Sequence, residues 1–176
     1  MTNQILLSGF GGQGILFTGK FLAYRGLLQN KNVSWLPSYG PEMRGGTASC
    51  SVIISDDEIG SPIISEPDIL IAMNLPSFEK FAPKVKAGGI VIADSSLIET
   101  KSTRDDISVH YIPATSLASD MGRQSLANMI ILGKLLYVLG EFNEEEIKTA
   151  LAKVIPPKKA DMLEINLNAM KIGANN

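Results

Sequence analysis

The chain has 176 residues, of which 45% are hydrophobic, and a formal net charge of −2. This size and apolar content suit one compact domain, residues 1–176, with a substantial core. Basic residues are scattered along the chain, which argues against nucleic acid or an anionic membrane as a partner. The sequence shows neither a signal-peptide pattern nor an apolar segment of membrane length, so we expect a cytoplasmic protein.

Apolar runs and helical patterns alternate along the chain. The apolar runs predict strands at residues 5–8, 33–36, 47–55, 67–74, 90–93 and 109–112. Helical spacing and capping residues predict helices at 15–29, 77–87 with Ser77 as N-cap, 125–139, from Asn143 onwards, and 160–171. Parallel strands need helical crossovers, and these crossovers cover the sheet. The alternation therefore predicts an α/β three-layer sandwich, with a mostly parallel sheet flanked by helices on both faces.

A glycine-rich loop, SGFGGQG, follows the first predicted strand. Gly9, Gly11 and Gly14 fit the G-x-G-x-x-G pattern that places a pyrophosphate over a helix N-terminus. A nicotinamide-adenine site also needs an acidic residue at the end of the second strand, to hold the ribose hydroxyls. Residues 35–37 read Trp-Leu-Pro instead, which argues against that cofactor.

The same segment contains a G-x-x-x-x-G-K pattern, from Gly14 to Lys20, typical of nucleoside-triphosphate loops. The next residue is Phe21, where such a loop needs a serine or threonine to hold magnesium. We therefore expect Lys20 to be an ordinary surface lysine.

Two interpretations of the glycine loop stay open. The helix start offers backbone amides suited to a phosphate, a carboxylate or the backbone of another protein. Alternatively, the glycines only permit a helix to pack tightly against a strand. The candidate binding residues are Gly9, Gly11, Gly12, Gln13 and Gly14.

A second stiff loop, PSYGPEMRGG, spans residues 37–46. Its prolines fix two φ angles and its glycines permit sharp turns. Arg44 either pairs with Glu42 or is available to a carboxylate or phosphate. Tyr39, Pro41 and Glu42 are candidates for contact with a partner, or for internal bracing of the loop. Both loops follow strands, so we expect them to lie side by side.

The remaining reactive residues predict no catalytic centre. One cysteine, Cys50, excludes an internal disulfide, and with one histidine, His110, it cannot supply the ligands of a zinc site or an iron–sulfur cluster. Cys50 alternates with apolar neighbours and is expected in the core. His110 lacks a nearby serine and aspartate arranged as a triad. The acidic residues 144–146 are explained by a favourable interaction with a helix dipole.

Together, the two loops resemble a known family. GFGGQGI, PSYGPEMRGGTASCSV, EPDILIAMN, GGIVIADSSLI and LANMIILGKLL occur in the order found in the gamma subunit of 2-oxoacid:ferredoxin (acceptor) oxidoreductases. This is the family that acts on pyruvate, 2-oxoglutarate or 2-oxoisovalerate. The similarity covers nearly the whole chain, and the pairing of the two loops is more specific than either loop alone.

The resemblance implies one subunit of a complex that oxidatively decarboxylates a 2-oxoacid to the acyl-coenzyme A. Thiamine diphosphate, magnesium and iron–sulfur clusters would lie in partner alpha, beta and ferredoxin-like delta subunits, which pass electrons to ferredoxin or another acceptor. This chain would serve assembly and coenzyme A access, through the glycine loop and Arg44, and would not be catalytic alone. The substrate favoured by overall likeness is 2-oxoglutarate or a branched-chain oxoacid. The alternatives are the small subunit of indolepyruvate ferredoxin oxidoreductase and a free-standing nucleotide-binding α/β protein.

Overall fold

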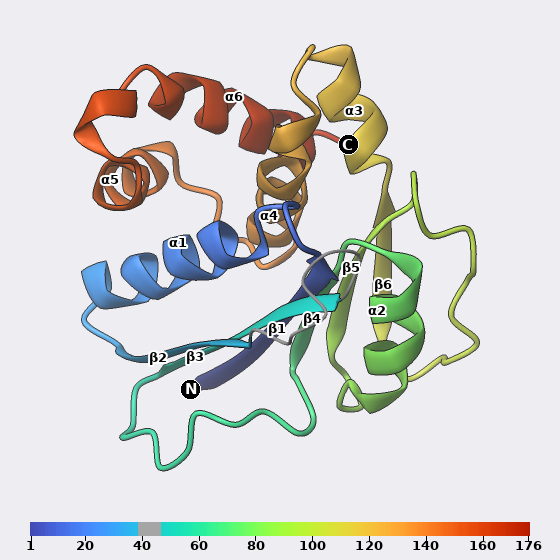
Figure 1. Cartoon of the computed structure of the whole chain (residues 1–176). Coiled ribbons are helices and arrows are strands. Elements are labelled where there is room, and N and C mark those ends of the chain that lie inside the picture. The colour runs from blue at the N-terminus through green and yellow to red at the C-terminus, as the bar shows by residue number, and fades with distance from the viewer. Residues whose placement is uncertain (39–46) are drawn as a thin grey trace.

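The computed structural model describes residues 1–38 and 47–176. Its sheet has the strand order β2-β3-β1-β4-β5-β6 (Figure 1). The strands are β1 (Thr2–Phe10), β2 (Asn32–Ser38), β3 (Thr47–Ser55), β4 (Ile69–Ala72), β5 (Ile90–Asp94) and β6 (Ser108–Ile112). The strands β1, β4, β5 and β6 run parallel to one another, whereas β3 is antiparallel to both β1 and β2. The predicted mostly parallel α/β sheet is therefore confirmed, with an antiparallel hairpin at one edge.

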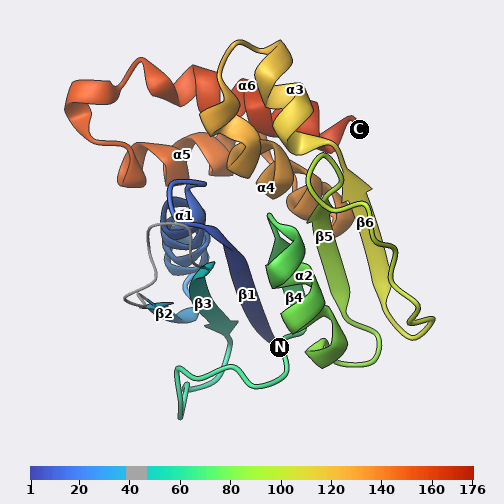
Figure 2. The ribbon, with the colours of Figure 1, turned by 45° about the vertical axis from the view of Figure 1, so that its right-hand side comes forward.

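The helices cover the two faces of the sheet unequally (Figures 1 and 2). One face carries α2 (Leu75–Phe81) and a following 3-10 turn, η1 (Ala82–Lys84). The helices α1 and α4 lie against the opposite face, and α5 and α6 form a further layer over them, with α3 beside α4 and α6. Their bounds are α1 (Ile15–Leu28), α3 (Ala114–Asp120), α4 (Ala127–Val138), α5 (Glu144–Val154) and α6 (Met162–Ala174), with 3-10 turns η2 (Gln124–Leu126) and η3 (Pro157–Lys159).

Alternation along the central strands divides the core between these two faces. Leu7 and Ile71 join the cluster that contains α1, α4 and α6. Their neighbours Leu6 and Leu70 join the smaller cluster under α2. Successive strand residues point to opposite faces, so the continuous apolar runs of β1 and β4 are explained by burial on both sides.

Two predicted helix ends were wrong for local reasons. The N-cap of α2 is Asn74, not Ser77; the Asn74 side-chain oxygen accepts the Ser77 backbone N–H at 2.8 Å. The helix predicted to reach residue 87 ends at Phe81. Pro83 lacks the amide hydrogen needed to continue the α-helical hydrogen bonds, and the chain continues as the 3-10 turn η1. The sequence interpretation also missed α3, whose small polar residues give little helical periodicity.

The crossing of α4 and α6 depends on two glycines. A Cβ at Gly173 would lie 1.8 Å from the carbonyl oxygen of Ile130, and one at Gly133 would lie 2.0 Å from that of Met170. The two backbones therefore touch directly, at a separation that no other residue type permits. This close approach lets α4, which is apolar on nearly all sides, be covered by both the sheet and α6.

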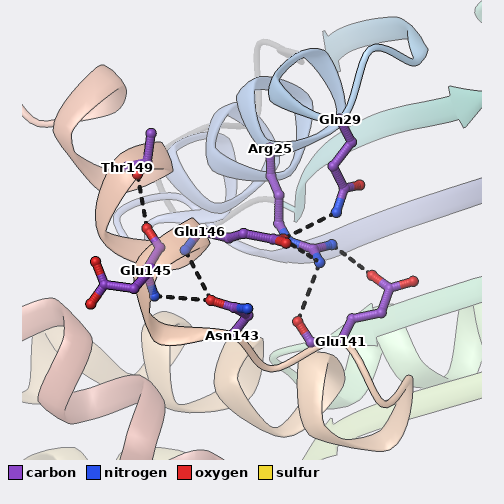
Figure 3. A network of polar contacts seen from close by, with 7 residues as sticks. All are labelled: Arg25, Gln29, Glu141, Asn143, Glu145, Glu146 and Thr149. Atoms are coloured by element: carbon purple, nitrogen blue, oxygen red, sulfur yellow. Dashed lines mark hydrogen bonds and ion pairs between the residues drawn. The ribbon is translucent and has the colours of Figure 1, made fainter.

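A buried arginine joins the two helix layers (Figure 3). The Arg25 guanidinium, on α1, donates to the Glu141 carboxylate at 2.6 Å and the Glu141 carbonyl at 3.2 Å, and lies 3.4 Å from Glu146 on α5. Only 6% of the Arg25 side chain is exposed. Asn143 caps α5, as predicted, by accepting the backbone N–H groups of residues 145 and 146.

The acidic run at the start of α5 does more than complement the helix dipole. Glu146 contacts Arg25, and Glu144 forms an ion pair with Lys171 of α6 at 2.8 Å. Two of the three carboxylates thus connect α5 to other helices, a role that the interpretation from the sequence did not assign.

We predict that Gly173→Ala lowers the free energy of unfolding by at least about 2 kcal/mol, because the new methyl group must separate two helix backbones. Inside a helix, alanine is normally more stabilising than glycine by about 1 kcal/mol. A loss of stability would therefore show that the clash between backbones outweighs the gain in helix propensity. Gly60→Ala is the control and should shift the urea midpoint little, because an added Cβ there would meet no described atom within 4 Å. A Gly173→Ala protein that is more stable than the wild type would contradict the close backbone contact between α4 and α6.

We also predict that Glu141→Gln destabilises the protein by about 1–3 kcal/mol, because the buried Arg25 charge loses its shortest ionic contact. The control is Glu145→Gln, since that side chain is 88% exposed; its cost should stay below about 1 kcal/mol, from the helix dipole. Urea denaturation of both variants measures the difference. Equal midpoints would show that the Arg25 network adds nothing to stability.

Candidate functional site

The sheet topology creates a crevice at the carboxyl ends of β1 and β4. These neighbouring strands are parallel, yet α1 leaves β1 toward one face and α2 leaves β4 toward the other (Figure 2). Such a switch point is where open α/β sheets bind their ligands. A cavity of about 380 Å³ opens here, lined by Gly12, Gln13, Met73, Leu97, Thr115, Gln124, Ser125 and Ala127. We call it the switch-point crevice.

Two of the loop glycines are needed for packing. A Cβ at Gly9, within β1, would lie 2.6 Å from the Gln13 side-chain oxygen and 3.0 Å from the Met73 Cβ. Gly14 precedes α1 in a left-handed conformation, and a Cβ there would lie 2.4 Å from the side-chain nitrogen of Asn128. Tight packing is therefore enough to explain why glycine occupies these two positions.

Gly12 is different, because its surroundings are open. It has a φ of +92°, which other residue types rarely adopt, but a Cβ there would meet no atom of the described residues within 4 Å. Gly12 lines the switch-point crevice and also, with Gly11 and Gly14, a second cavity of about 250 Å³. We call this second cavity the helix-start pocket. The loop backbone at Gly12 thus separates two spaces.

Gln13 braces the loop from within. Its side-chain oxygen accepts the Phe10 N–H at 2.6 Å, and its side-chain nitrogen donates to the Met73 carbonyl at 3.0 Å. The side chain therefore ties the loop to the end of β4. This contact makes Gln13 a positioning residue of the crevice wall, in addition to one of its lining residues.

The helix-start pocket is surrounded by the first turn of α1. Ile15, Leu16 and Phe17 line it, and the first amides of a helix have no acceptor within the helix. In residues 1–38 and 47–176 no side-chain cap of α1 is seen, and its first internal bond runs from Thr18 N–H to the Gly14 carbonyl. The other described lining residues are mostly apolar or glycine, so the unpaired amides at the helix start are the feature of this pocket that suits an anion.

The second sequence motif begins and ends beside this pocket. Ser38 and Ala48, from β2 and β3, line it, and Phe10 pairs with Thr47 in the sheet. The expected proximity of the two loops is confirmed for the residues that flank the second one. The candidates Tyr39, Pro41, Glu42 and Arg44 themselves lie outside the described residues.

Several lining residues escaped the sequence interpretation. These residues have no motif of their own: Leu97 follows β5, Thr115 lies in the first turn of α3, and Gln124 and Ser125 lie in η2. One signal was available in Asp94, a carboxylate that ends the apolar run of β5 and is fully buried. Asp94 holds the first turn of α3 by accepting from the backbone N–H and hydroxyl of Thr115.

The reactive residues considered from the sequence lie away from the crevice lining. Cys50 is buried, as predicted, and burial raises the pKa of its thiol to about 12, opposed by a weaker hydrogen bond from Trp35. Burial, and then the charge of Lys134, lowers the pKa of His110. Lys20 is exposed on α1, as expected for a surface lysine.

The described residues include no group of three or more histidine, cysteine, aspartate or glutamate side chains placed to hold a metal ion. In the same part of the chain, no helix combines the length and apolar character needed to cross a membrane.

Comparison with known proteins identifies relatives along the whole chain. It is 36% identical over 173 residues to ketoisovalerate oxidoreductase subunit VorA of Methanothermobacter marburgensis, covering 98% of this chain and 36% of that protein. It is also 36% identical over 159 residues to 2-oxoglutarate synthase subunit KorC of Methanocaldococcus jannaschii, covering 89% and 85%. The chain thus spans about a third of the VorA protein but most of KorC.

Solved structures share the fold. The gamma subunit of a keto/oxoacid ferredoxin oxidoreductase from Geobacter sulfurreducens has a TM-score of 0.81 at 28% identity, covering 98% of this chain and 96% of that one. The 2-oxoglutarate:ferredoxin oxidoreductase of Magnetococcus marinus, solved with 2-oxoglutarate, coenzyme A and succinyl-CoA bound, has a TM-score of 0.85 at 25% identity, covering 99% and 30%. The pyruvate ferredoxin/flavodoxin oxidoreductase family matches residues 4–176. The motif resemblance is therefore confirmed at the level of the family, and this chain is a member of the pyruvate ferredoxin/flavodoxin oxidoreductase family.

Proposed function

We propose that this chain is the gamma subunit of a 2-oxoacid:ferredoxin (acceptor) oxidoreductase, a complex that oxidatively decarboxylates a 2-oxoacid to an acyl-coenzyme A. Its own role is assembly and admission of coenzyme A. The proposal depends on the position of the glycine loop, which lies at the switch point and lines two cavities. The same fold occurs in an oxidoreductase that was solved with coenzyme A bound. The match to this chain covers 85% of KorC, which supports a separate subunit of about this size.

The chemistry itself belongs to partner subunits. Oxidative decarboxylation needs thiamine diphosphate with magnesium, and electron transfer needs iron–sulfur clusters. One cysteine cannot ligate a cluster, and Cys50 is buried with a raised thiol pKa. We therefore assign thiamine diphosphate and the clusters to alpha, beta and ferredoxin-like delta subunits, with ferredoxin or a similar protein as acceptor.

The helix-start pocket is the proposed site for the phosphates of coenzyme A. Its support is that Ile15, Leu16 and Phe17, the first residues of α1, line the pocket together with Gly12, and that the first amides of a helix suit an anion. Gly11 and Gly14 also line this pocket. Gly9 permits close packing of the loop, and Gln13 holds the loop by a hydrogen bond to the Phe10 N–H. Arg44 is proposed as a cationic partner on the basis of the sequence motif.

The relatives favour 2-oxoglutarate or a branched-chain oxoacid as the substrate of the complex. Relatives named for ketoisovalerate and for 2-oxoglutarate are equally similar, at 36% identity. The indolepyruvate oxidoreductase subunit IorB of Archaeoglobus fulgidus is 26% identical, which makes the indolepyruvate alternative weaker. The strand β2 ends in Trp-Leu-Pro-Ser, without the acid that a free-standing dinucleotide-binding protein would need.

The test is to tag this chain in its native host and isolate it gently without oxygen. We expect partner subunits that contain thiamine diphosphate and iron–sulfur clusters, and reduction of a dye that requires both coenzyme A and one member of a panel of 2-oxoacids. The active oxoacid identifies the substrate. A chain that purifies alone, with no such activity, would overturn the proposal.

We predict that Arg44→Ala, in the assembled complex, raises the KM for coenzyme A about tenfold, as expected for the loss of one charge-assisted hydrogen bond, or weakens assembly. The thermal midpoint of the isolated chain should not change. Lys20→Ala, which removes an exposed cation from α1, is the matched control. Unchanged assembly and unchanged coenzyme A kinetics would remove Arg44 from the proposed site.

A further inference from the structure

A groove lies between the end of α1 and the start of α5. Its volume is about 320 Å³, and its lining residues are Arg25, Leu28, Gln29, Glu145, Glu146 and Thr149. We call it the α1–α5 groove. None of these six residues lines the switch-point crevice or the helix-start pocket, so the groove is separate from the site described above.

The charge of this groove is mainly negative. Among its described lining residues Arg25 is the one cation, and its guanidinium is already bound by Glu141 at 2.6 Å. Glu146 contacts Arg25 only at 3.4 Å, through one of its two carboxylate oxygens (Figure 3). Glu145 is 88% exposed and lies 3.8 Å from Lys148, and an exposed pair at this distance is worth little. Two carboxylates of α5 are therefore available to an incoming cation.

The α1 side of the groove is apolar. Leu28 lines it and is 43% exposed, and the adjacent Leu27 is 54% exposed. Lysine and arginine side chains cover apolar surface with their methylene stems while their charged ends stay with polar partners. An exposed leucine opposite two carboxylates therefore matches a basic side chain better than an apolar or an acidic one.

A buried donor in the groove wall favours a polypeptide as the source of that side chain. The Nε–H of Arg25 is buried and has no acceptor among the described residues, although Arg25 lines the groove. A buried donor without an acceptor is unfavourable, and a backbone carbonyl of a bound segment supplies one. A small organic amine brings only the cation, whereas a polypeptide brings the cation and carbonyl groups together.

We propose that the α1–α5 groove docks a basic segment of a partner subunit, with a lysine or arginine side chain lying along Leu28 and its cation bound by Glu145 and Glu146. This inference rests on the proposed function, in which the chain is one subunit of a complex. A second copy of this chain fits less well. In a two-fold contact through the groove the same surface meets itself, so the two acidic rims would repel each other.

The test dilutes the assembled complex at low and at high salt and measures by sedimentation the apparent Kd at which this chain dissociates. Glu145→Lys should raise this Kd about tenfold at low salt, because it places a like charge beside the bound cation. The effect should shrink at high salt, which screens exposed charges. Leu28→Asn should raise the Kd about three- to fivefold at both salt concentrations, because the loss of an apolar contact is not screened.

Two further variants separate docking from overall charge and from stability. Glu79→Lys makes the same charge reversal at an exposed position of α2, on the opposite face of the sheet (Figure 2), and should leave the Kd unchanged. Glu145→Gln removes the charge without reversing it and should raise the Kd at low salt by a smaller factor, about threefold. Thermal midpoints of the isolated variants show whether each chain is folded. Glu145→Gln decides the question if Glu145→Lys does not fold.

The outcomes distinguish this inference from the proposed function. If the complex assembles and the variants at residues 28 and 145 dissociate like the wild type, the inference fails alone. If Glu79→Lys weakens assembly as much as Glu145→Lys does, overall charge governs assembly and the groove is not the docking site. If the isolated wild-type chain dimerises and Glu145→Lys abolishes the dimer, the occupant is a second copy and the proposal is wrong. If the chain purifies without partners, both proposals fail together.

Discussion

The opposite departure of α1 and α2 from neighbouring strands is the constraint on which the site depends. β1 and β4 are parallel and adjacent, so helices on the same face would close the space above their carboxyl ends. With α1 on one face and α2 on the other, the ends of both strands stay open, and the connections to α3 and α4 form the far wall. The burial of alternate residues of β1 and β4 in different clusters fixes this arrangement.

Glycine has two separate roles in this protein. At Gly9, Gly133 and Gly173 the absence of a side chain permits close packing, since an added Cβ would meet neighbouring atoms at 3.0 Å or less. At Gly12 it permits a left-handed backbone, and no atom in the described part of the chain would lie within 4 Å of an added Cβ. A glycine motif by itself does not distinguish these roles, because both need the same residue type.

The outer layer of helices stabilises the loop from a distance. Arg25 lies on α1, and its bonds to Glu141 and Glu146 hold that helix against α5 (Figure 3). The α4–α6 crossing holds α4 in turn, and Asn128 of α4 donates to the Gly14 carbonyl at 3.3 Å. The start of α1 is therefore fixed by contacts with residues more than 100 positions away in the sequence.

The sequence by itself determined the α/β class, the positions of the strands and the family, because apolar runs, helical spacing and two paired motifs are local signals. It also placed Cys50 in the core and Asn143 at a helix start. Only the tertiary structure decided that β3 is antiparallel, that Gly9 and Gly14 serve packing, and that Gln13 binds the loop internally. Thr115 and Asp94 had no motif, because their contact joins the end of β5 to the start of α3, and such long-range contacts leave no periodicity in the chain.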